Sequence, residues 1–355
     1  MLLSKPKQTG FISSKEGKLF SLYDVTIPDE VKFLVFFQDI IYGHSPLDVL
    51  KYVSENKFFS TRSGMVYLSK NLCHFLKARP LCFSNLIEIY DSLCSQPDFG
   101  AKFRETFVKS LAINFGIRMI SYLFYTDRIE ESLVPRLEDE AIIQAYFPTL
   151  AKGKKAQMMT ESFNSKGFAE CIFNGWEKNS LGYIIKFDLV DVLQEYSSVP
   201  GFKWNEVIKS GFYEKIPESM SLLTLAAYYG SEKCFSLILL NSEIDEDVKK
   251  YSIIGGNISI VRQIEQITNS IPLYLTECML YNHNDLFGWM VENKVCDSIF
   301  SANLSISSNL RGFFFIIENS TNQYLRSRLV FFLFLEALYL NLQLKMGPSL
   351  FWNFY

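Results

Sequence analysis

Histidine and cysteine, the residues that most often carry catalytic or metal chemistry, are unfavourably spaced in this chain. The histidines are His44, His74 and His283, and none stands at metal-ligand spacing with another ligand. Cys73 and His74 could act as a nucleophile and its base only if the fold corrected their geometry, because adjacent residues point in different directions on a helix. We therefore expect a core or half-buried histidine at position 74.

Other short patterns with catalytic meaning are incomplete. Ser54 and Lys57 match an S-x-x-K spacing without its companion motifs, and no G-x-S-x-G or H-E-x-x-H sequence occurs. Gly153-Lys154 is not part of the G-x-x-x-x-G-K-[ST] pattern that a phosphate-binding loop requires. The acidic run 138–140 could hold a cation, but, like the run 245–247, it favours stabilisation of a helix N-terminus. The sequence therefore predicts no catalytic, cofactor-binding or metal site, and a protein that is not an enzyme.

The composition is that of a folded chain without an electrostatic footprint for nucleic acid. Of its 355 residues, 48% are hydrophobic and 21% are charged, which is typical of globular rather than disordered proteins. The net charge of −3 predicts no basic surface for nucleic acid. The 32 phenylalanines and 19 tyrosines could form aromatic binding surfaces, but we expect them to fill the core. This length allows two or more domains, or one solenoid with a leading domain.

Cysteine usage and hydropathy predict an intracellular protein. The most apolar run, Leu329–Leu335, breaks at Glu336 and is too short to span a membrane. The N-terminal sequence lacks the apolar core of a signal peptide. The cysteine count is odd and no C-x-x-C pair occurs, so we expect buried free thiols in a reducing compartment, most simply the cytoplasm. The cysteines are Cys73, Cys82, Cys94, Cys171, Cys234, Cys278 and Cys296.

The first half of the chain reads mainly as helices. Ser45 suits a helix N-cap and Pro46 the first helical position, with an apolar stripe at Leu47, Val49, Leu50 and Val53. The apolar segment Val31–Tyr42 could be a buried strand, but its length favours a buried helix. Ala151–Lys155 is the clearest linker. Further helices are expected over Gly64–Lys77, Ser84–Leu93, Phe103–Ala112, Ile117–Phe124 and Glu138–Tyr146.

A faint repeat organises the second half. Gly230, Gly256, Asn282 and Ser308 follow one another at a spacing of 26 residues, each within a similar apolar pattern. Equal spacing of this kind indicates stacked supersecondary units rather than one enzyme core. We expect each unit to be two short antiparallel helices joined by a tight turn at its anchor residue. An earlier unit around residues 187–188 is separated from Gly230 by an insertion.

The residue types at the turns support this interpretation. Ala226 and Ala227 lie on the first helix of the clearest unit, where small side chains would let the next unit approach closely. Gly230 ends that helix, because glycine adopts the left-handed conformation without steric cost. Second helices then carry apolar stripes at Cys234, Phe235, Ile238 and Leu239; at Ile258, Val261 and Ile264; at Leu286, Trp289 and Met290; and at Leu310, Phe313 and Ile317. The turn residues of the later units are Gly256-Asn257, Asn282-His283 and Ser308-Asn309.

The pattern resembles a degenerate ankyrin array. Residues 221–227 (SLLTLAA) stand where ankyrin units carry T-P-L-H-x-A-A, and Gly230-Ser231 stands at the G-H position. The amino-acid sequence of the second half resembles that of a family of ankyrin-like proteins expanded in trichomonad-like parasitic protists. The helical N-terminal half of these proteins has no assigned role. The segments that carry this resemblance are Asn179–Leu193, Ser221–Leu239, Tyr251–Asn257, Tyr281–Met290 and Ser307–Leu310. The resemblance implies that His283 braces its turn and that a protein partner binds the concave face formed by first helices and loops.

The chain also departs from the ankyrin pattern. No T-P-L-H occurs, and a 26-residue spacing is shorter than the ankyrin period of ~33 residues, which leaves too little chain for a full hairpin between units. Repeat arrays need polar terminal caps, but the C-terminal end of this chain is strongly apolar. We therefore expect an array that is truncated or uncapped at that end.

Together these patterns predict an all-α protein with a helical N-terminal domain over residues 1–175 and ankyrin-like repeats over residues 176–355. Trp176 and Trp204 are expected to anchor the junction by packing. The predicted function is a non-catalytic protein-interaction module or scaffold, with no cofactor, metal or nucleic acid. Two alternatives stay open at this point. One is a truncated structural remnant without a stable partner, and the other is an enzyme that uses Cys73 or the cluster at Glu138 in the N-terminal half.

Overall fold

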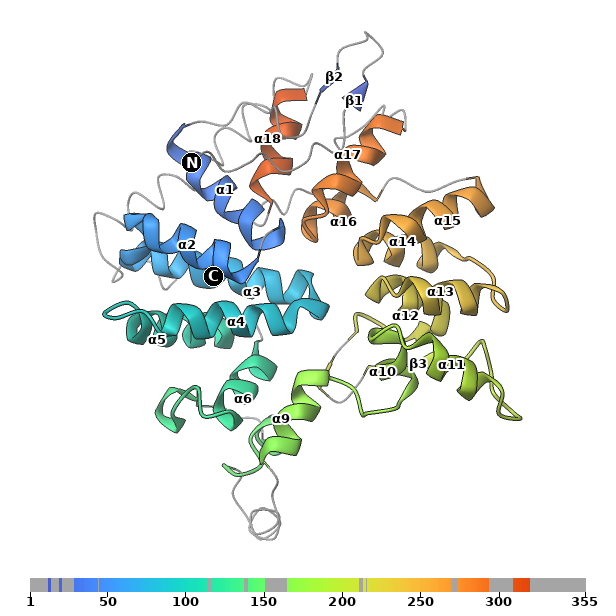
Figure 1. Ribbon diagram of the computed structural model, residues 1–355, viewed down its shortest axis with the longest axis horizontal. Coiled ribbons are helices and arrows are strands. Elements are labelled where there is room, and N and C mark those ends of the chain that lie inside the picture. The colour runs from blue at the N-terminus through green and yellow to red at the C-terminus, as the bar shows by residue number, and fades with distance from the viewer. Residues whose placement is uncertain are drawn as a thin grey trace. The chain divides into compact units, whose positions relative to one another are not determined.

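The computed structural model describes residues 12–13, 19–20, 29–43, 45–113, 116–136, 140–150, 165–210, 213–214, 216–269, 274–293 and 309–319. Helices dominate these residues, which confirms the all-α class (Figure 1). None of the helices described is long and apolar enough to cross a membrane. The predicted features at His44, Glu138, Asp139, Cys296, Ser308, Ala151–Lys155 and Leu329–Leu335 lie outside the described residues.

The chain packs as two compact units, which we describe separately. Unit 1 combines Met1–Ala78 with Leu273–Tyr355, and unit 2 is Arg79–Pro272. The boundary predicted after residue 175 falls inside unit 2. The division into a domain over residues 1–175 and a repeat domain over residues 176–355 stays a prediction.

Unit 1 contains helices from both ends of the sequence. Its N-terminal part has a short antiparallel strand pair, in which Ile12 lies opposite Phe20, followed by three helices. The described residues of its C-terminal part form three more helices. The elements are β1 (Ile12–Ser13), β2 (Leu19–Phe20), α1 (Asp29–Gly43), α2 (Pro46–Glu55), η2 (Lys57–Ser60), α3 (Arg62–Ala78), α16 (Leu275–Leu280), α17 (Asn284–Asn293) and α18 (Leu310–Asn319).

Local signals explain how the N-terminal helices of unit 1 form. The apolar segment that could have been a strand is helix α1, and Phe37 from this helix packs on Phe59 with ring centroids 4.7 Å apart. Ser45 caps α2 as predicted, because its side chain accepts a hydrogen bond from the Asp48 N–H. The apolar stripe of α2 was predicted one residue too wide: Val49 and Val53 are buried, whereas Leu47 is 71% exposed.

Helices α1 and α18, from opposite ends of the chain, are joined by polar contacts inside unit 1. The Arg311 guanidinium forms a two-point ion pair with the Asp39 carboxylate. Gln38 accepts a hydrogen bond from the Leu310 N–H at 2.9 Å and donates one to Asn71 of α3 at 3.0 Å. The first turn of α18 is therefore held by side chains of α1. The sequence alone predicted only an irregular repeat in this region.

Unit 2 begins with helices that match the predicted segments closely and continues into the helix pairs. The stretch between α11 and α12 is the predicted insertion, and it forms a short antiparallel strand pair in which Val207 lies opposite Ser221. The elements are η3 (Pro80–Cys82), α4 (Phe83–Cys94), α5 (Gly100–Ile113), α6 (Ile117–Tyr125), η4 (Glu131–Leu133), α7 (Glu140–Tyr146), α9 (Ser165–Asn174), α10 (Leu181–Lys186), α11 (Val190–Ser197), β3 (Val207–Ile208), β4 (Met220–Ser221), α12 (Leu222–Tyr229), α13 (Glu232–Leu239), α14 (Glu246–Gly255) and α15 (Ile258–Thr268).

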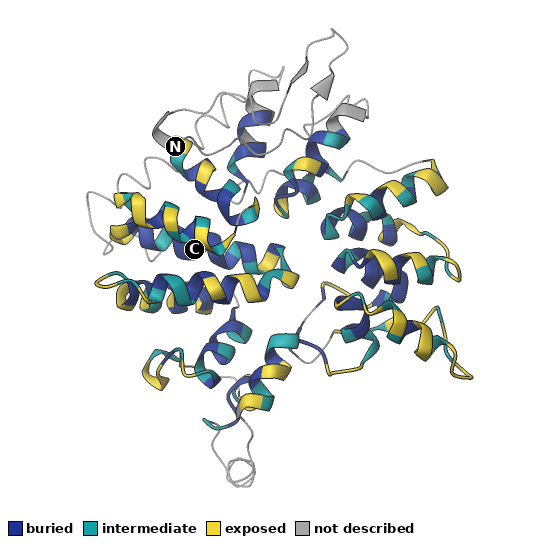
Figure 2. Ribbon diagram, viewed as in Figure 1, coloured by how far each residue is buried: buried dark blue, intermediate teal, exposed yellow. Residues whose placement is uncertain are grey.

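The helix pairs of unit 2 stack in order. The first helices α10, α12 and α14 pack on one another, and the second helices α11, α13 and α15 do the same (Figure 1). Their buried sides face neighbouring helices and their exposed sides face outward (Figure 2). Helix α12 is enclosed within its own unit by α10, α13, α14 and β4. The arrangement gives an inner layer of first helices and an outer layer of second helices.

Candidate functional site

The anchor residues of the repeat share one backbone conformation. Gly230, Gly256 and Asn282 have positive φ angles of 67°, 72° and 54°, and Asp188 of the earlier unit has a φ of 52°. Each ends the first helix of a pair, where a left-handed residue lets the chain reverse. Asn and Asp tolerate this conformation better than other residues with side chains, which explains why glycine is replaced at two of the four turns.

Ser231, Asn257 and Asn309, which each follow an anchor position, make polar contacts to the preceding helix pair. Ser231 donates from its hydroxyl to the Ile185 carbonyl at 2.6 Å, and the Asn257 side chain donates to the Gly230 carbonyl at 2.9 Å. In unit 1, Asn309 donates to the Asn284 side chain at 2.8 Å. His283 occupies the corresponding position and is buried. These contacts hold successive turns side by side, so that the helix pairs stack in register.

The alanines of α12 lie where two first helices approach each other. Ala226 and Ala227 are fully buried. A Cβ atom added to Gly255 of α14 would lie only 2.1 Å from the Ala227 carbonyl oxygen. The close approach thus requires a glycine on α14 facing the small residues of α12. Most residues predicted to form the apolar stripes of the second helices are buried. These residues are Cys234, Phe235, Ile238, Val261, Ile264, Leu286 and Met290.

Four residues of the predicted stripes differ from expectation. Ile258 is exposed because it begins α15, before the helix face turns toward the core. Leu239, Trp289 and Leu310 are only half-buried. The side chains of Phe313 and Ile317 lie outside the described residues.

The first helix α12 exposes little of its surface. All residues from Leu222 to Ala227 are buried, and Tyr228 is half-buried. The predicted partner surface on the first helices and loops stays a prediction. Most exposed large apolar side chains in the described part of the chain instead lie between Phe187 and Ile267, on the second helices and the segments beside them. A partner of these helix pairs would therefore meet the outer layer.

A buried ionic network ties the helices before residue 175 to the helix pairs. The carboxylate of Glu214 accepts hydrogen bonds from Arg118 of α6 at 2.9 Å, from Tyr229 of α12 at 2.7 Å, and from Lys186 of α10. The side chain of Lys186 is 1% exposed and that of Glu214 is 6% exposed. Trp176 donates to the Tyr229 hydroxyl at 2.9 Å and so joins the same network.

The cations of this network are also satisfied by backbone carbonyls at the end of α9. Arg118 donates to the carbonyls of Ile172 and Phe173 at 2.8 and 2.7 Å, and Lys186 donates to the carbonyl of Asn174 at 2.9 Å. Burial lowers the pKa of Lys186, although Glu214 opposes this shift. Burial also raises the pKa of Tyr229, helped by Glu214. These groups are enclosed and mutually paired, and they connect α6 and the end of α9 to α10 and α12.

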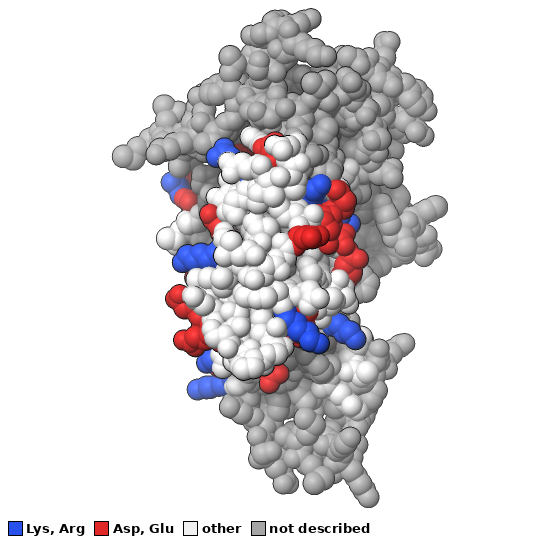
Figure 3. Space-filling model, turned by 90° about the vertical axis from the view of Figure 1, so that its right-hand side faces the viewer, with Lys and Arg blue, Asp and Glu red and all other residues white. Residues whose placement is uncertain are grey.

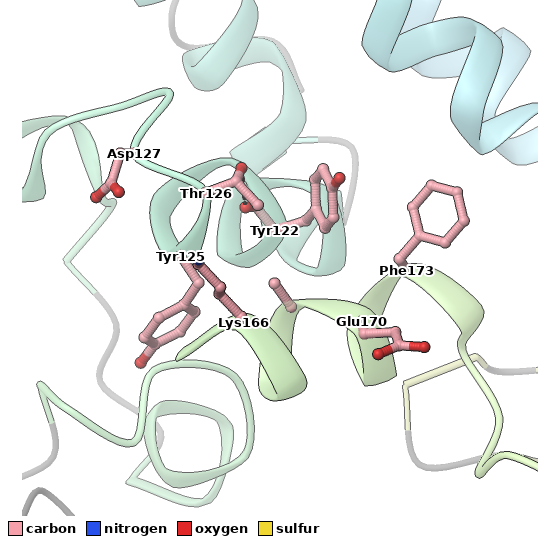
Figure 4. A pocket seen from close by; sticks show the side chains of 8 residues that line it. Tyr122, Tyr125, Thr126, Asp127, Lys166, Glu170 and Phe173 are labelled. Carbon is pink, nitrogen blue, oxygen red and sulfur yellow. Dashed lines mark hydrogen bonds between the residues drawn. The ribbon is translucent and has the colours of Figure 1, made fainter. Parts of the chain in front are cut away.

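The pocket beside this junction lies between α6 and α9 (Figure 4) and has a volume of about 510 Å³. Its floor is apolar, from Tyr122, Ala169 and Phe173. The carboxylates of Asp127 and Glu170 lie on opposite sides of the view in Figure 4, so they do not form an acid–base pair. The Tyr125 hydroxyl contacts Thr149 at 2.9 Å. The pocket offers an apolar surface without convergent reactive groups.

The thiol and histidine candidates show burial rather than activation. Burial raises the pKa of Cys73 to about 12, whereas a catalytic thiol needs a lowered pKa. His74 is half-buried, and burial lowers its pKa, with Lys77 and Lys70 adding to the shift. Among the residues described, no group of three histidine, cysteine or acidic side chains could hold a metal ion. The expectation of buried thiols was wrong for Cys171, which is exposed.

Thiol labelling of the native protein should follow this burial. We expect iodoacetamide to modify Cys171 first, because it is the exposed thiol of the described residues, and to leave Cys73, Cys234 and Cys278 unmodified until unfolding. Peptide-resolved mass spectrometry over a time course measures this, with urea-unfolded protein as the control. Labelling of Cys73 as fast as that of Cys171 would contradict the prediction and would reopen the N-terminal enzyme hypothesis.

Comparisons with protein-family models, with curated proteins and with solved structures find no match to this chain. The resemblance to ankyrin arrays therefore stays a prediction from the sequence.

Proposed function

We propose that this protein is a non-catalytic protein-interaction module built on a degenerate ankyrin-like array. The observation that supports this most directly is the stacking of the helix pairs α10–α11, α12–α13 and α14–α15, each turning at a residue with positive φ. Stacked pairs present a long, rigid surface, which repeat proteins commonly use to bind other proteins. The exposed apolar residues of the outer layer are consistent with such a use.

The most direct test is capture of a partner by the intact chain. Tagged full-length protein from source cells is expected to retain a discrete partner in a fixed ratio, identified by mass spectrometry. A full-length Gly255→Val variant, in which the stack is disrupted, is the control and should lose that partner while gaining chaperones. If wild-type protein also captures only chaperones, or nothing, the proposal fails, and a structural protein without a stable partner is the better hypothesis.

A further inference from the structure

Three successive helix pairs each expose an apolar side chain near the end of the second helix. Val199, Leu240 and Ile267 are 60%, 79% and 58% exposed. They follow the turn residues Asp188, Gly230 and Gly256 by 11, 10 and 11 positions. Val199 lies two residues after α11, Leu240 lies directly after α13, and Ile267 lies in the last turn of α15.

Because the second helices stack, these three residues should follow one another across the outer layer, and we call the set the apolar row. The polar contacts between successive turns bring the starts of the second helices together, and α13 packs on both α11 and α15. Their C-terminal ends therefore also follow one another. A single exposed apolar residue is ordinary on a protein surface, but recurrence at one position in stacked units makes a continuous strip.

The charges around the apolar row are unevenly distributed. The face carrying α11, α13 and α15 is largely uncharged in its centre, and its largest group of acidic side chains gathers along one margin (Figure 3). Immediately after Leu240 the chain carries exposed acidic residues, and no lysine or arginine occurs between Cys234 and Val248. These acidic residues are Glu243, Asp245, Glu246 and Asp247.

We propose that the apolar row binds an amphipathic, net-basic helix of a partner protein; this rests on the proposed function above. Packed helices lie about 8–10 Å apart, so neighbouring members of the row should have a similar spacing. Residues seven apart on a helix are about 10.5 Å apart along its axis, and they lie on nearly the same face. Apolar residues at i, i+7 and i+14 of a partner helix therefore match the row, in the manner of helix recognition by anchor residues.

An extended strand matches the apolar row less well. Side chains on one face of a strand repeat at about 6.6 Å or 13 Å, because successive residues point to opposite faces. Neither distance fits helices packed at about 8–10 Å. The exposed acidic residues that follow Leu240 in the sequence complement lysine and arginine on the flanks of the bound helix and disfavour an acidic one.

A photo-crosslinking experiment on the full chain tests the occupant. A photoreactive phenylalanine analogue replaces Leu240 in tagged protein expressed in source cells, and mass spectrometry identifies the crosslinked segment. We expect a segment that is helical as a free or bound peptide, carries apolar residues at heptad spacing and has a net positive charge. A crosslinked segment that is extended, or acidic, overturns the proposal.

Matched variants then measure how much the apolar row contributes. A synthetic peptide of the crosslinked segment should bind the Leu240→Asn/Ile267→Asn double variant at least about tenfold more weakly than wild type, as expected for loss of central apolar anchors. The control is Leu47→Asn, an equally exposed leucine on α2, which should change the affinity less than about twofold. Equal affinities for wild type and the double variant overturn the proposal.

The same variants separate the failure of this inference from failure of the proposed function. If a discrete partner is captured by wild type and equally by the double variant, the protein is an interaction module, but the apolar row is not its contact surface. If wild type captures no discrete partner, the proposed function fails, and the inference fails with it.

Discussion

Replacing Glu214 with alanine is expected to lower the free energy of unfolding by about 3–5 kcal/mol, the range for removing one partner of a buried ion pair. The variant leaves Lys186 and Arg118 charged in a buried site and also removes the hydrogen bond from Tyr229. Their remaining partners are neutral backbone carbonyls, which cannot replace a carboxylate. Urea unfolding of the full-length protein measures the loss.

A matched control separates burial from charge. Glu105 pairs with Lys109 on α5, but both side chains are more than half exposed, so Glu105→Ala should cost less than about 1 kcal/mol. Adding Lys186→Met to Glu214→Ala should recover part of the lost free energy of unfolding, because it removes one of the two buried cations that no longer face a carboxylate. Similar small losses for Glu214→Ala and Glu105→Ala would show that the Glu214 network does not hold this junction together.

The loss in Glu214→Ala should also depend on pH. Burial lowers the pKa of Lys186 in the folded protein below its ordinary value of 10.5. A lysine whose pKa is lowered by folding destabilises the protein while both states hold the proton, and this penalty disappears as pH rises through the window between the folded pKa and 10.5. Without Glu214, which raises the pKa of Lys186, this penalty is larger. The difference from wild type should therefore shrink as pH rises toward 10.5.

Gly255→Ala is expected to destabilise the protein by about 1–3 kcal/mol, although alanine favours a helix over glycine by up to about 1 kcal/mol. The added Cβ would lie 2.1 Å from the Ala227 carbonyl oxygen and 2.9 Å from that of Tyr228. Both are backbone atoms of α12, which is packed on all sides within its unit and cannot shift cheaply. The substitution must therefore separate α12 from α14.

Gly288→Ala is the matched control for this prediction. Gly288 lies inside α17, and an added Cβ there would have no other atom within 4 Å. This substitution should stabilise the protein by about 0.5–1 kcal/mol through helix propensity alone. Urea unfolding of both variants should thus give changes of opposite sign. A stabilising effect of both would mean that α12 and α14 are not in close contact.

Much of the secondary structure was predictable because its signals are local. Ser45 and Pro46 begin α2 in the positions expected from capping and from the fixed proline backbone. Gly230 and Gly256 end first helices in the left-handed conformation that only a few residue types tolerate. These features depend on groups within one helical turn, so the neighbouring sequence is enough to reveal them.

The polar contacts that join distant segments were not predictable in this way. Glu214 contacts Arg118 and Lys186 across 96 and 28 residues, and Asp39 contacts Arg311 across 272 residues. The sequence around a charged residue does not show which residue, so far along the chain, will form an ion pair with it. In the sequence, Glu214 reads as an ordinary solvated side chain, and only its burial in the folded unit identifies it as the centre of a network.

The sequence by itself determined that this chain is helical, where most helices begin and end, and that units recur at 26 residues in its second half. Hydrophobic periodicity, helix caps and turn residues involve only a few neighbouring positions, so they can be recognised from the local sequence. Only the tertiary structure decided that α12 is enclosed, that Val199, Leu240 and Ile267 are exposed, and that α1 holds α18. Burial and pairing depend on which helices meet, and that is set by the packing of the whole unit.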